Sequence, residues 1–434
     1  MKTKSKIILM GLLTTTILLV TTAVTFCAQL SENTWTRLEG VAEKSTRSYD
    51  VAVDKDGNSY MIGDVGSDDT GVYGSMVSKY AADGTKLWTK KFGSDVATTS
   101  AQAVALDSAG NCYVTGVTEG KIDGLELIGM MDAFIVKYKP DGTKEWLKLI
   151  GVPDAFTNSI DIAIDKLDNF YITGSTDGNL NNQVLTGDID LFIAMYNSAG
   201  VHQWTKLLGA AEKTITGCAI AVDNNYNIYV AGYTDSGLDG QNIKIPSDGL
   251  VVKYDSKGNK KWTRLVGAVG TGEEVYAIAN SIALDSNGNS FIAGETNGQI
   301  DDKAKIGSLD TFIIAYTPDG NKLWSKLLGV KKADTGTAGI VIDSLNNLYI
   351  SGYTDGLLGQ AKIGKKDGFV AKYNAATTKE WIKQFGVTNG IIVNRSIAID
   401  KNNLLYVVGS TNVALDGQSK IGLTDAFITT YFNK

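Results

Sequence analysis

Seven tryptophans divide the chain into units of similar length. Successive tryptophans are 53, 58, 58, 58, 62 and 57 residues apart, a glycine follows each of them by five residues, and an aspartate ends a short apolar segment in every unit. The seven are Trp35, Trp88, Trp146, Trp204, Trp262, Trp324 and Trp381. Self-similarity at such a period is typical of solenoids, propellers and repeat arrays, in which each unit buries its faces against its neighbours.

Each unit contains four short segments with the composition of β-strands. In the third unit these are residues 159–165, 170–174, 190–196 and 202–209, separated by turns rich in Gly, Asn, Asp and Ser. Short runs of β-forming residues divided by such turns indicate strands and hairpins, and no helical period competes with them. Four antiparallel strands repeated radially predict the blade of a β-propeller.

The two ends of the repeat array are complementary. Residues 34–40 form a fourth strand with no preceding three, and residues 425–434 form a third strand with no fourth. We therefore expect an all-β, seven-bladed β-propeller in which the N-terminal strand completes the last blade, so that Trp35 lies in the same blade as Phe427 and Tyr431. Pairing the two ends removes two exposed sheet edges.

The repeats assign residues 33–434 to the propeller. The expected blades are 46–93, 99–151, 157–209, 215–267, 276–329, 337–386, and 394–434 together with 33–40.

The first 28 residues are predicted to be a signal peptide. Three lysines precede an uncharged apolar run over 7–24, which is the order of a secretory leader. Ordinary cleavage after Cys27 or Ala28 would release the protein, whereas lipidation of Cys27 would attach it to a membrane. Phe26 is large where lipoprotein processing prefers a small residue. We expect an exported protein, either secreted or attached to the cell surface or outer membrane.

The composition after the leader excludes several classes of protein. Removing the leader changes the formal charge from −6 to −9, and no basic run survives, so nucleic acid is not an expected partner. No later apolar run has the length of a transmembrane helix. The two cysteines that follow the leader, Cys112 and Cys218, are too few for a disulfide framework. They fall in blades 2 and 4, so we expect them to be too far apart to bridge.

The repeated segments resemble a known family. Residues 82–88 (ADGTKLW), 132–138 (DAFIVKY), and 221–223 (AVD) with 227–232 (NIYVAG) are similar to the bacterial seven-bladed β-propeller repeat (SBBP) proteins. The resemblance covers the whole chain after the leader. It implies an exported, often surface-attached protein, including lipoprotein-like members, and it implies no common activity.

The sequence offers no catalytic or metal-binding constellation. The single histidine, His202, stands where other units have lysine, so a multi-histidine metal site is excluded. The turns 54–58 and 285–289 resemble the start of a calcium loop, but Val65 and Thr296 occupy the position of the closing acid. We interpret them as hairpin turns, and we expect no cofactor, no metal and no assigned catalytic residue. The scattered carboxylates leave a hydrolase pair open.

A threonine and an aspartate bracket the loop between the second and third strands in six units. The threonines are Thr118, Thr176, Thr234, Thr296, Thr354 and Thr411, and the aspartates are Asp132, Asp190, Asp248, Asp310, Asp367 and Asp425. The first unit has Val65 and Gly74 instead and a shorter loop. We predict that each pair holds its loop through side-chain-to-backbone hydrogen bonds; six equivalent ligand sites are the alternative.

One link between blades is longer than the others. The distance from tryptophan to closing aspartate is 19 residues in every unit except one, where Trp262 and Asp285 are 23 residues apart. Loops on this face bring together an aromatic and several acids, namely Glu273, Glu274, Tyr276, Glu295, Asp301 and Asp302. We interpret them as a candidate binding site for a cation or a basic ligand, because variable loops on a rigid scaffold commonly carry binding. A tolerated surface insertion with solvated acids is the alternative.

These features predict a binding platform rather than a catalyst. We expect a monomeric, exported propeller that binds a protein or glycan partner on its loop face. The alternatives are a polysaccharide-acting hydrolase or lyase on a propeller scaffold, and a structural protein of the cell envelope.

Overall fold

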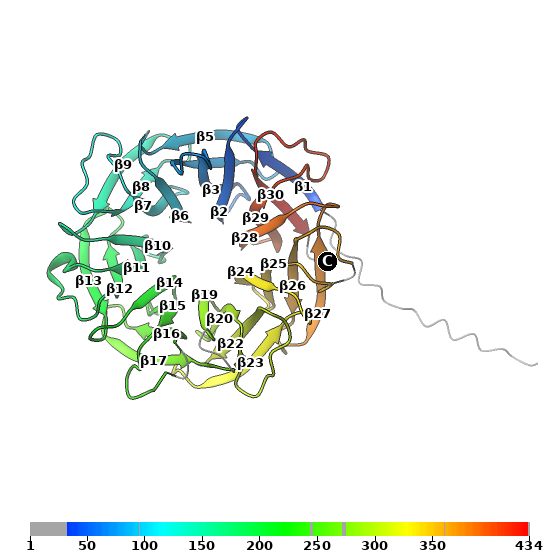
Figure 1. The fold of residues 1–434 in the computed structure, drawn as a ribbon. Helices are drawn as coiled ribbons and strands as arrows, with labels where there is room; N and C mark the ends of the chain where they lie inside the picture. Colours follow the sequence, from blue (N-terminus) through cyan, green and yellow to red (C-terminus); the bar gives the residue numbers. More distant parts are fainter. Residues whose placement is uncertain (1–32, 95, 244–245, 271–274, 360, 433–434) are drawn as a thin grey trace, which may run out of the picture.

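A computed structural model shows seven four-stranded antiparallel sheets arranged radially around a central axis (Figure 1). It describes residues 33–94, 96–243, 246–270, 275–359 and 361–432. The predicted all-β, seven-bladed propeller is confirmed. The predicted signal peptide and Cys27 lie outside the described residues.

The strands follow the same order in every blade, from the axis to the rim. Blade 1 contains β2 (Ser45–Val53), β3 (Ser59–Gly66), β4 (Tyr73–Tyr80) and β5 (Lys86–Phe92), and blade 2 contains β6 (Thr99–Leu106), β7 (Cys112–Thr118), β8 (Asp132–Tyr138) and β9 (Lys144–Ile150). Blade 3 contains β10 (Thr157–Ile164), β11 (Phe170–Thr176), β12 (Asp190–Tyr196) and β13 (His202–Leu208), and blade 4 contains β14 (Ile215–Val222), β15 (Ile228–Thr234), β16 (Asp248–Tyr254) and β17 (Lys260–Val266). Blade 5 contains β19 (Ala277–Leu284), β20 (Ser290–Thr296), β22 (Asp310–Tyr316) and β23 (Lys322–Leu328), and blade 6 contains β24 (Thr335–Ile342), β25 (Leu348–Thr354), β26 (Asp367–Tyr373) and β27 (Lys379–Phe385). Blade 7 contains β28 (Ile392–Ile399), β29 (Leu404–Thr411), β30 (Asp425–Phe432) and β1 (Asn33–Glu39). Three shorter elements lie between them: η1 (Leu180–Asn182), β18 (Ala268–Val269) and β21 (Gln299–Ile300).

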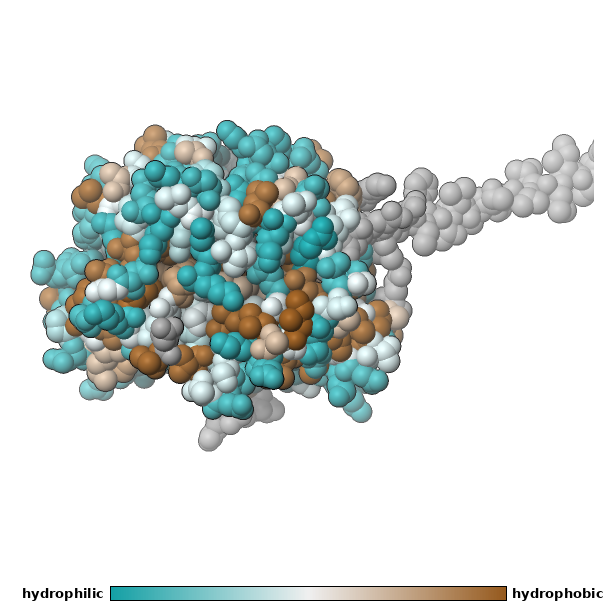
Figure 2. Space-filling model, turned by 90° about the horizontal axis from the view of Figure 1, so that it is seen from above, coloured by the Kyte–Doolittle hydropathy of each residue, from teal (hydrophilic) through white to brown (hydrophobic). Residues whose placement is uncertain are grey.

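The hydrophobic core lies between the blades. Seven clusters of buried apolar side chains each combine residues of two neighbouring blades, so every junction of the ring has one. At the junction of blades 2 and 3, for example, Ile135 and Tyr113 belong to the same cluster as Phe192 and Ile172. The outermost strands are only partly buried, and Figure 2 shows hydrophobic side chains in small groups among hydrophilic ones on the outer surface. The core therefore stabilises the ring as a closed series of contacts.

The tryptophans join neighbouring blades. The indole N–H of Trp35 donates to the carbonyl of Ala82, and that of Trp88 donates to the carbonyl of Pro140, each in the next blade. Gly84 lies against Trp35 with a φ of +78°, and a Cβ at this position would come within 2.6 Å of the indole ring. The tryptophans are half-buried rather than fully buried, because their outer edges reach the rim.

The N-terminal strand closes the ring. Strand β1 pairs with β30, which carries Phe427 and Tyr431, and the sheet order is β1-β30-β29-β28. The ring centroid of Trp35 lies 6.2 Å from that of Tyr406 in the same blade and 6.2 Å from that of Tyr80 in blade 1. The predicted closure is confirmed, and the tryptophan also contacts the first blade.

The closing strand carries a buried carboxylate at its end. Glu39 accepts hydrogen bonds from Ser78 Oγ at 2.8 Å and Thr89 Oγ1 at 3.3 Å, and it forms an ion pair with Lys86 at 3.0 Å. The corresponding residues of the other blades are apolar: Phe92, Ile150, Leu208, Val266, Leu328 and Phe385. The closing strand is therefore matched to blade 1 by a carboxylate, which no other outermost strand carries at this position.

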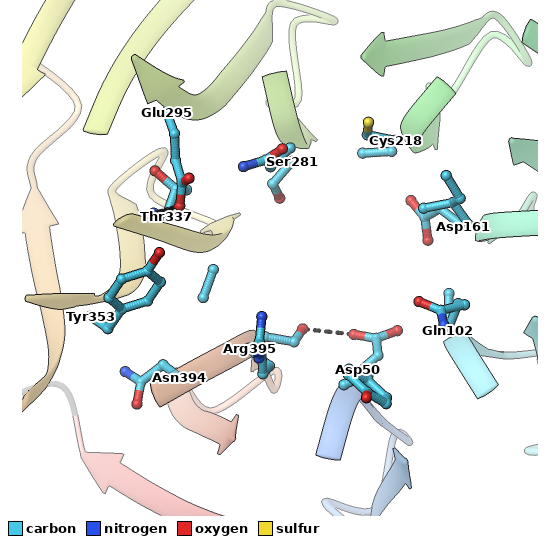
Figure 3. A pocket seen from close by; sticks show the side chains of 17 residues that line it. Asp50, Gln102, Asp161, Cys218, Ser281, Glu295, Thr337, Tyr353, Asn394 and Arg395 are labelled. Atoms are coloured by element: carbon cyan, nitrogen blue, oxygen red, sulfur yellow. Dashed lines mark hydrogen bonds between the residues drawn. The ribbon is translucent and has the colours of Figure 1, made fainter. Parts of the chain in front are cut away.

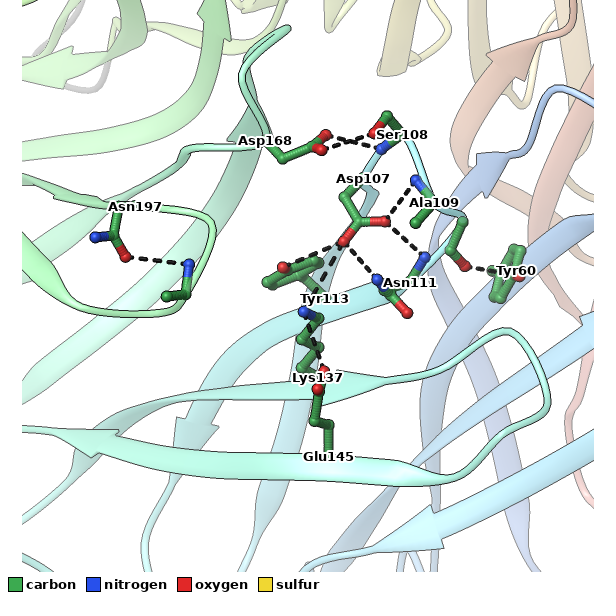
Figure 4. Close-up of polar contacts among 12 residues, drawn as sticks. Tyr60, Asp107, Ser108, Ala109, Asn111, Tyr113, Lys137, Glu145, Asp168 and Asn197 are labelled. Carbon is green, nitrogen blue, oxygen red and sulfur yellow. Dashed lines mark hydrogen bonds and ion pairs between the residues drawn. The ribbon is translucent and has the colours of Figure 1, made fainter.

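The aspartates that end the innermost strands cap hairpin turns. Asp107 accepts hydrogen bonds from the backbone N–H groups of Ala109 and Asn111 and from the Asn111 amide (Figure 4). Asp54 and Asp285 make the same contacts in their own turns. The hairpin interpretation of the turns at 54–58 and 285–289 is therefore confirmed, because these carboxylates are already hydrogen-bonded to the turn.

The threonine and aspartate pairs bracket their loops, as predicted. Thr118 stands opposite Asp132 in the strand register, and its hydroxyl exchanges hydrogen bonds with the backbone of Gly120. Asp132 accepts from the backbone N–H groups of Ile128 and Gly129 at 2.6 and 2.9 Å. The other five threonines contact the backbone two residues on, and four more aspartates repeat the second pattern. In five of the six blades both members therefore hold the loop in place, and blade 1, which lacks both members, has a shorter loop.

The glycine that follows the tryptophan makes room for this aspartate at Gly40, Gly151, Gly209, Gly329 and Gly386. A Cβ at Gly151 would come within 1.9 Å of Asp132 Oδ1, and one at Gly209 within 1.7 Å of Asp190 Oδ1. The repeated glycine therefore reflects the close approach of a backbone to a buried carboxylate.

Candidate functional site

Each innermost strand carries one extra residue in its pairing with the second strand. In β2 the register skips between Ser48 and Asp50, and in β10 it skips between Ser159 and Asp161. The skipped residues are Tyr49, Gln102, Ile160, Cys218, Asn280, Ala338 and Arg395. A β-bulge redirects the side chain it carries. All seven of these residues line a pocket on the propeller axis.

The axial pocket receives residues from all seven blades and has a volume of about 480 Å³. This volume lies within the range of small-molecule sites. Besides the bulged residues, Glu295 of β20 and Tyr353 of β25 form one wall, and Asp50 and Asp161 lie on the other side (Figure 3).

Asp50 joins three blades at the edge of this pocket. Its Oδ2 accepts from the Val104 N–H of blade 2 at 2.9 Å, and its Oδ1 accepts from Ser396 Oγ of blade 7 at 2.6 Å. Burial raises the pKa of Asp50 to about 6, and the hydrogen bonds from Ser396 and Val104 oppose that rise. Both carboxylate oxygens of Asp50 are therefore used by the fold.

Asp161 has the same role between blades 3 and 4. Its Oδ1 accepts from its neighbour Ile162 N–H at 2.8 Å, and its Oδ2 accepts from Ile220 N–H at 2.7 Å. Burial raises the pKa of Asp161 to about 8, and the carboxylate of Asp50 adds to the rise. Both oxygens of this carboxylate are also bonded to backbone groups.

The opposite wall combines charges of both signs. Glu295 Oε1 accepts from the Thr337 N–H at 2.9 Å, and burial raises the pKa of the Glu295 carboxyl while Thr337, Arg395 and Lys366 oppose the rise. Burial, followed by the Glu295 charge, raises the pKa of Tyr353 to about 12. Lys366 Nζ lies 4.4 Å from the centroid of the Tyr353 ring. This wall therefore holds a neutral phenol, a carboxylate and two cations.

The acidic edge expected from the long link is partly assembled. Strand β18 of the link pairs with β21 of the blade 5 loop, so these two segments lie side by side, as their proposed shared face requires. Glu273 and Glu274 lie outside the described residues. Tyr276 is half-buried, and burial followed by the nearby Glu295 charge raises the Tyr276 pKa. Tyr276 and Glu295 are therefore close to each other.

Asp301 and Asp302 have different surroundings. Asp301 pairs with Lys322 of the outermost strand β23 at 2.6 Å, and Asp302 pairs with the adjacent Lys303 at 2.6 Å. An aspartate and a lysine 21 residues apart form the same pair in blade 4, where Asp239 meets Lys260. Asp301 thus occupies a repeated structural position, and neither aspartate lines the axial pocket.

Other candidate groups carry little chemistry in the described part of the chain. No group of three or more His, Cys, Asp and Glu side chains could hold a metal there. Cys112 and Cys218 are unbridged, and His202 contacts Thr205 and the ring of Tyr196. Among the described residues, no helix has the length and apolar character needed to cross a membrane.

The seven bulged residues of the pocket were not predicted as site residues from the sequence, because they have no shared chemistry. The segment that follows each bulge repeats as alternating apolar residues ending in aspartate, whereas the bulged position holds seven different residues. The sequence signal that could have identified them is a position that holds a different residue in every unit and lies beside positions that repeat.

Comparison with known proteins identifies related sequences. The sequence model of the family described as SBBP, Beta-propeller repeat, matches residues 34–68, 145–181, 203–239, 261–300, 323–359 and 380–415. An uncharacterized WD repeat-containing protein of Acanthamoeba polyphaga mimivirus is 24% identical over 80% of this chain and 32% of its own length. The Regulatory protein FlaEY of Caulobacter vibrioides is 23% identical over 83% of this chain and 42% of its own length. The chain thus spans less than half of either relative.

Solved structures with a similar fold include two polysaccharide lyases. One is 11% identical, with a TM-score of 0.50 over 91% of this chain and 90% of its own. The other, an ulvan lyase, is 11% identical, with a TM-score of 0.50 over 90% of this chain and 95% of its own. At this identity the likeness concerns the fold alone.

Proposed function

This chain belongs to the SBBP beta-propeller repeat family, and from that premise we propose that it is an exported binding platform whose axial pocket holds a protein or glycan ligand. One observation carries the proposal: the seven bulged residues that meet at the axis differ from blade to blade, while the residues that build the blades repeat. In a repeat protein the repeated positions maintain the stacking of units. Different side chains at the seven bulged positions, which meet at the axis, give the pocket the asymmetric lining that a specific ligand requires.

The chemistry of the pocket is suited to binding. Tyr49, Gln102, Asn280 and Arg395 bring hydroxyl, amide and guanidinium groups to one concave surface. They project from strands whose outer faces are held by the core clusters between blades, so the site is rigid before a ligand arrives. Pre-formed concave sites with a few convergent polar groups are the usual form of a ligand pocket.

A polysaccharide-acting lyase or hydrolase is the second candidate. It needs an available acid and base, whereas Asp50 and Asp161 accept hydrogen bonds on both oxygens. The raised pKa of Tyr353, about 12, favours the neutral phenol, which can donate a proton but is a poor base. In this arrangement the second candidate would depend on Glu295, which lines the pocket and accepts a hydrogen bond from the described residues on one oxygen only. A structural envelope protein without a ligand is the third.

The proposed location rests on the leader. Its lysines and apolar run support export, and Cys27 supports membrane attachment if it is lipidated. Mass spectrometry of the mature N-terminus in fractionated cells distinguishes the two routes. A lipid-modified Cys27 indicates attachment, an unmodified N-terminus at Ala28 or Gln29 indicates secretion, and an intact Met1 in the cytoplasm contradicts both.

The function is tested by a ligand screen. The mature propeller is screened against glycans and surface proteins, with the rise in melting temperature as the readout, because a ligand that binds only the folded state stabilises it. A hit should be lost in the double variant Gln102→Ala, Asn280→Ala and kept in the matched variant Asp301→Ala, Asp302→Ala. Loss in the second variant alone would move the site to the outer loop. Turnover of a glycan hit would assign an enzyme.

A further inference from the structure

The acids and the cations of the axial pocket differ in how far the fold already uses them. Asp50 and Asp161 accept hydrogen bonds on both oxygens, and Glu295 accepts one from the Thr337 N–H. The charge of each acid is therefore partly compensated by protein donors.

The Arg395 guanidinium has no hydrogen-bonded compensation among the described residues, although its charge acts on the Glu295 carboxyl of the same wall. Arg395 is exposed, lines the pocket, and makes no hydrogen bond or ion pair among the described residues. Figure 3 shows it next to Asn394, on the innermost strand of blade 7. A guanidinium offers five N–H donors in a planar fork that fits a carboxylate through two parallel hydrogen bonds. Its free donors are the largest unused hydrogen-bonding capacity of the pocket.

A second cation lies behind the same wall. Lys366 Nζ stands over the Tyr353 ring at 4.4 Å from its centroid and forms no ion pair within the described chain. Its charge is felt at Glu295, as is the charge of Arg395, so both cations act on one wall. Burial raises the pKa of Asp161 to about 8, which lowers the negative charge of that carboxyl at neutral pH on the other side.

We propose that the axial pocket binds a saccharide that carries a carboxylate, with Arg395 as the residue that binds the acid group. The inference rests on the proposed function and specifies its ligand. The remaining lining suits sugar hydroxyls, because Gln102, Asn280 and Tyr49 can donate and accept hydrogen bonds. Tyr353 adds a phenol hydroxyl to this lining.

A peptide fits the same pocket less well. Extended peptides bind by adding a strand to a free sheet edge. Within the described part of the chain, the sheet edges at the axis belong to the innermost strands, and a bulge interrupts the pairing of each one. Bulged edges disfavour strand addition. The pocket therefore favours a compact polyhydroxylated ring over a peptide backbone.

The test compares an acidic oligosaccharide with its neutral ester. Oligogalacturonate and its methyl ester share one backbone and differ only in the carboxylate, and glucuronate and mannuronate oligomers with their esters complete the panel. Isothermal titration of the mature protein at neutral pH and low salt should give at least about tenfold tighter binding for one of the acids. The preference should decline as salt is added.

Variants assign the preference to Arg395. Arg395→Gln should weaken binding of the acid by about tenfold or more and leave the ester unchanged, whereas Arg395→Lys should retain part of the preference. Lys55→Gln is the matched control, because Lys55 is exposed in the turn at the far end of β2. Melting curves establish that each variant is folded.

Three results would overturn the inference: equal affinity for acid and ester, an unchanged preference in Arg395→Gln, or no binding of any acidic oligomer at about 1 mM. A neutral glycan or protein that still binds at the axis would leave the proposed function standing. Failure of every ligand in the screen would remove both.

Discussion

The two sides of the axial pocket use their polar side chains for different purposes. On one side, Asp50 and Asp161 point toward neighbouring blades and accept their backbone N–H groups. On the other side, Glu295, Tyr353 and Arg395 line the pocket (Figure 3). The arginine makes no hydrogen bond or ion pair among the described residues. One side joins blades, and the other side presents groups to a ligand.

The difference shows that a charged side chain at the axis is not by itself a sign of function. Asp50 and Asp161 have the raised pKa values that often mark active sites. Their hydrogen bonds nevertheless identify them as connections between blades. Available hydrogen-bonding capacity is a better guide here than a perturbed pKa, and the four predictions that follow use this difference.

The largest effect is expected from deleting residues 33–39. This removes β1, exposes the edge of β30, and separates blade 7 from blade 1, where Ser396 donates to Asp50. Circular dichroism should show the loss of one cooperative melting transition, and gel filtration should show aggregation. A deletion variant that melts as the intact protein does would show that the joining side does not need closure.

Asp161→Ala should be the most costly single substitution at the axis. It leaves the N–H groups of Ile162 and Ile220 without an acceptor, which costs about 2–3 kcal/mol in the free energy of unfolding. Urea denaturation measures this loss. Asp302→Ala, at an exposed residue, is the control and should change stability by less than about 0.5 kcal/mol. Equal effects of the two substitutions would contradict the joining role.

The stability of the protein should depend on pH through the joining side. The pKa of Asp161 is raised to about 8 and that of Asp50 to about 6, so the folded state holds protons that the unfolded state has released. The contribution of these two carboxyls to the free energy of unfolding is fully present below their unfolded pKa of about 4, and it is lost as the pH rises toward 8. The slope is at most about 1.4 kcal/mol per pH unit for each group.

Urea denaturation at several pH values measures this slope, and Asp161→Asn should flatten it between pH values of about 6 and 8. An unchanged slope in Asp161→Asn, or a wild-type stability that increases with pH, would show that the two N–H donors outweigh burial.

The smallest effect on stability is expected at Arg395. Arg395→Gln removes an exposed charge without a hydrogen bond among the described residues, so the free energy of unfolding should change by less than about 0.5 kcal/mol. Thermal denaturation checks this. A loss of more than about 1 kcal/mol would place Arg395 among the residues that hold the ring together, and the contrast between the two sides would fail.

Local patterns predicted the fold because each rule acts within one unit. The tryptophan spacing indicated seven blades, and the incomplete sets of strands at the two ends indicated closure of the ring. The pairing of β1 with β30 confirms the closure. The threonine and aspartate pairs were predictable for the same reason, since Thr118 and Asp132 lie at opposite ends of one short loop.

The site could be predicted only in part. Glu295 was a candidate from its loop, and it lines the axial pocket beside Tyr353. Asp301 and Asp302 were grouped with it in the sequence, yet they meet lysines away from the pocket lining. The three residues are close in the sequence, so they were assigned to one loop. In the structure Glu295 lies in β20 and lines the pocket, whereas the two aspartates follow β20 and form ion pairs with lysines.

The sequence by itself determined the blades, because strand alternation, turn residues and the tryptophan period are local properties of each unit. Only the tertiary structure decided which residues face the axis. A bulge of one residue changes the side to which a side chain points, so Tyr49 and Arg395 reach the pocket. Closure then brings residues more than 300 positions apart into contact, as with Ser396 and Asp50, and no local pattern carries that information.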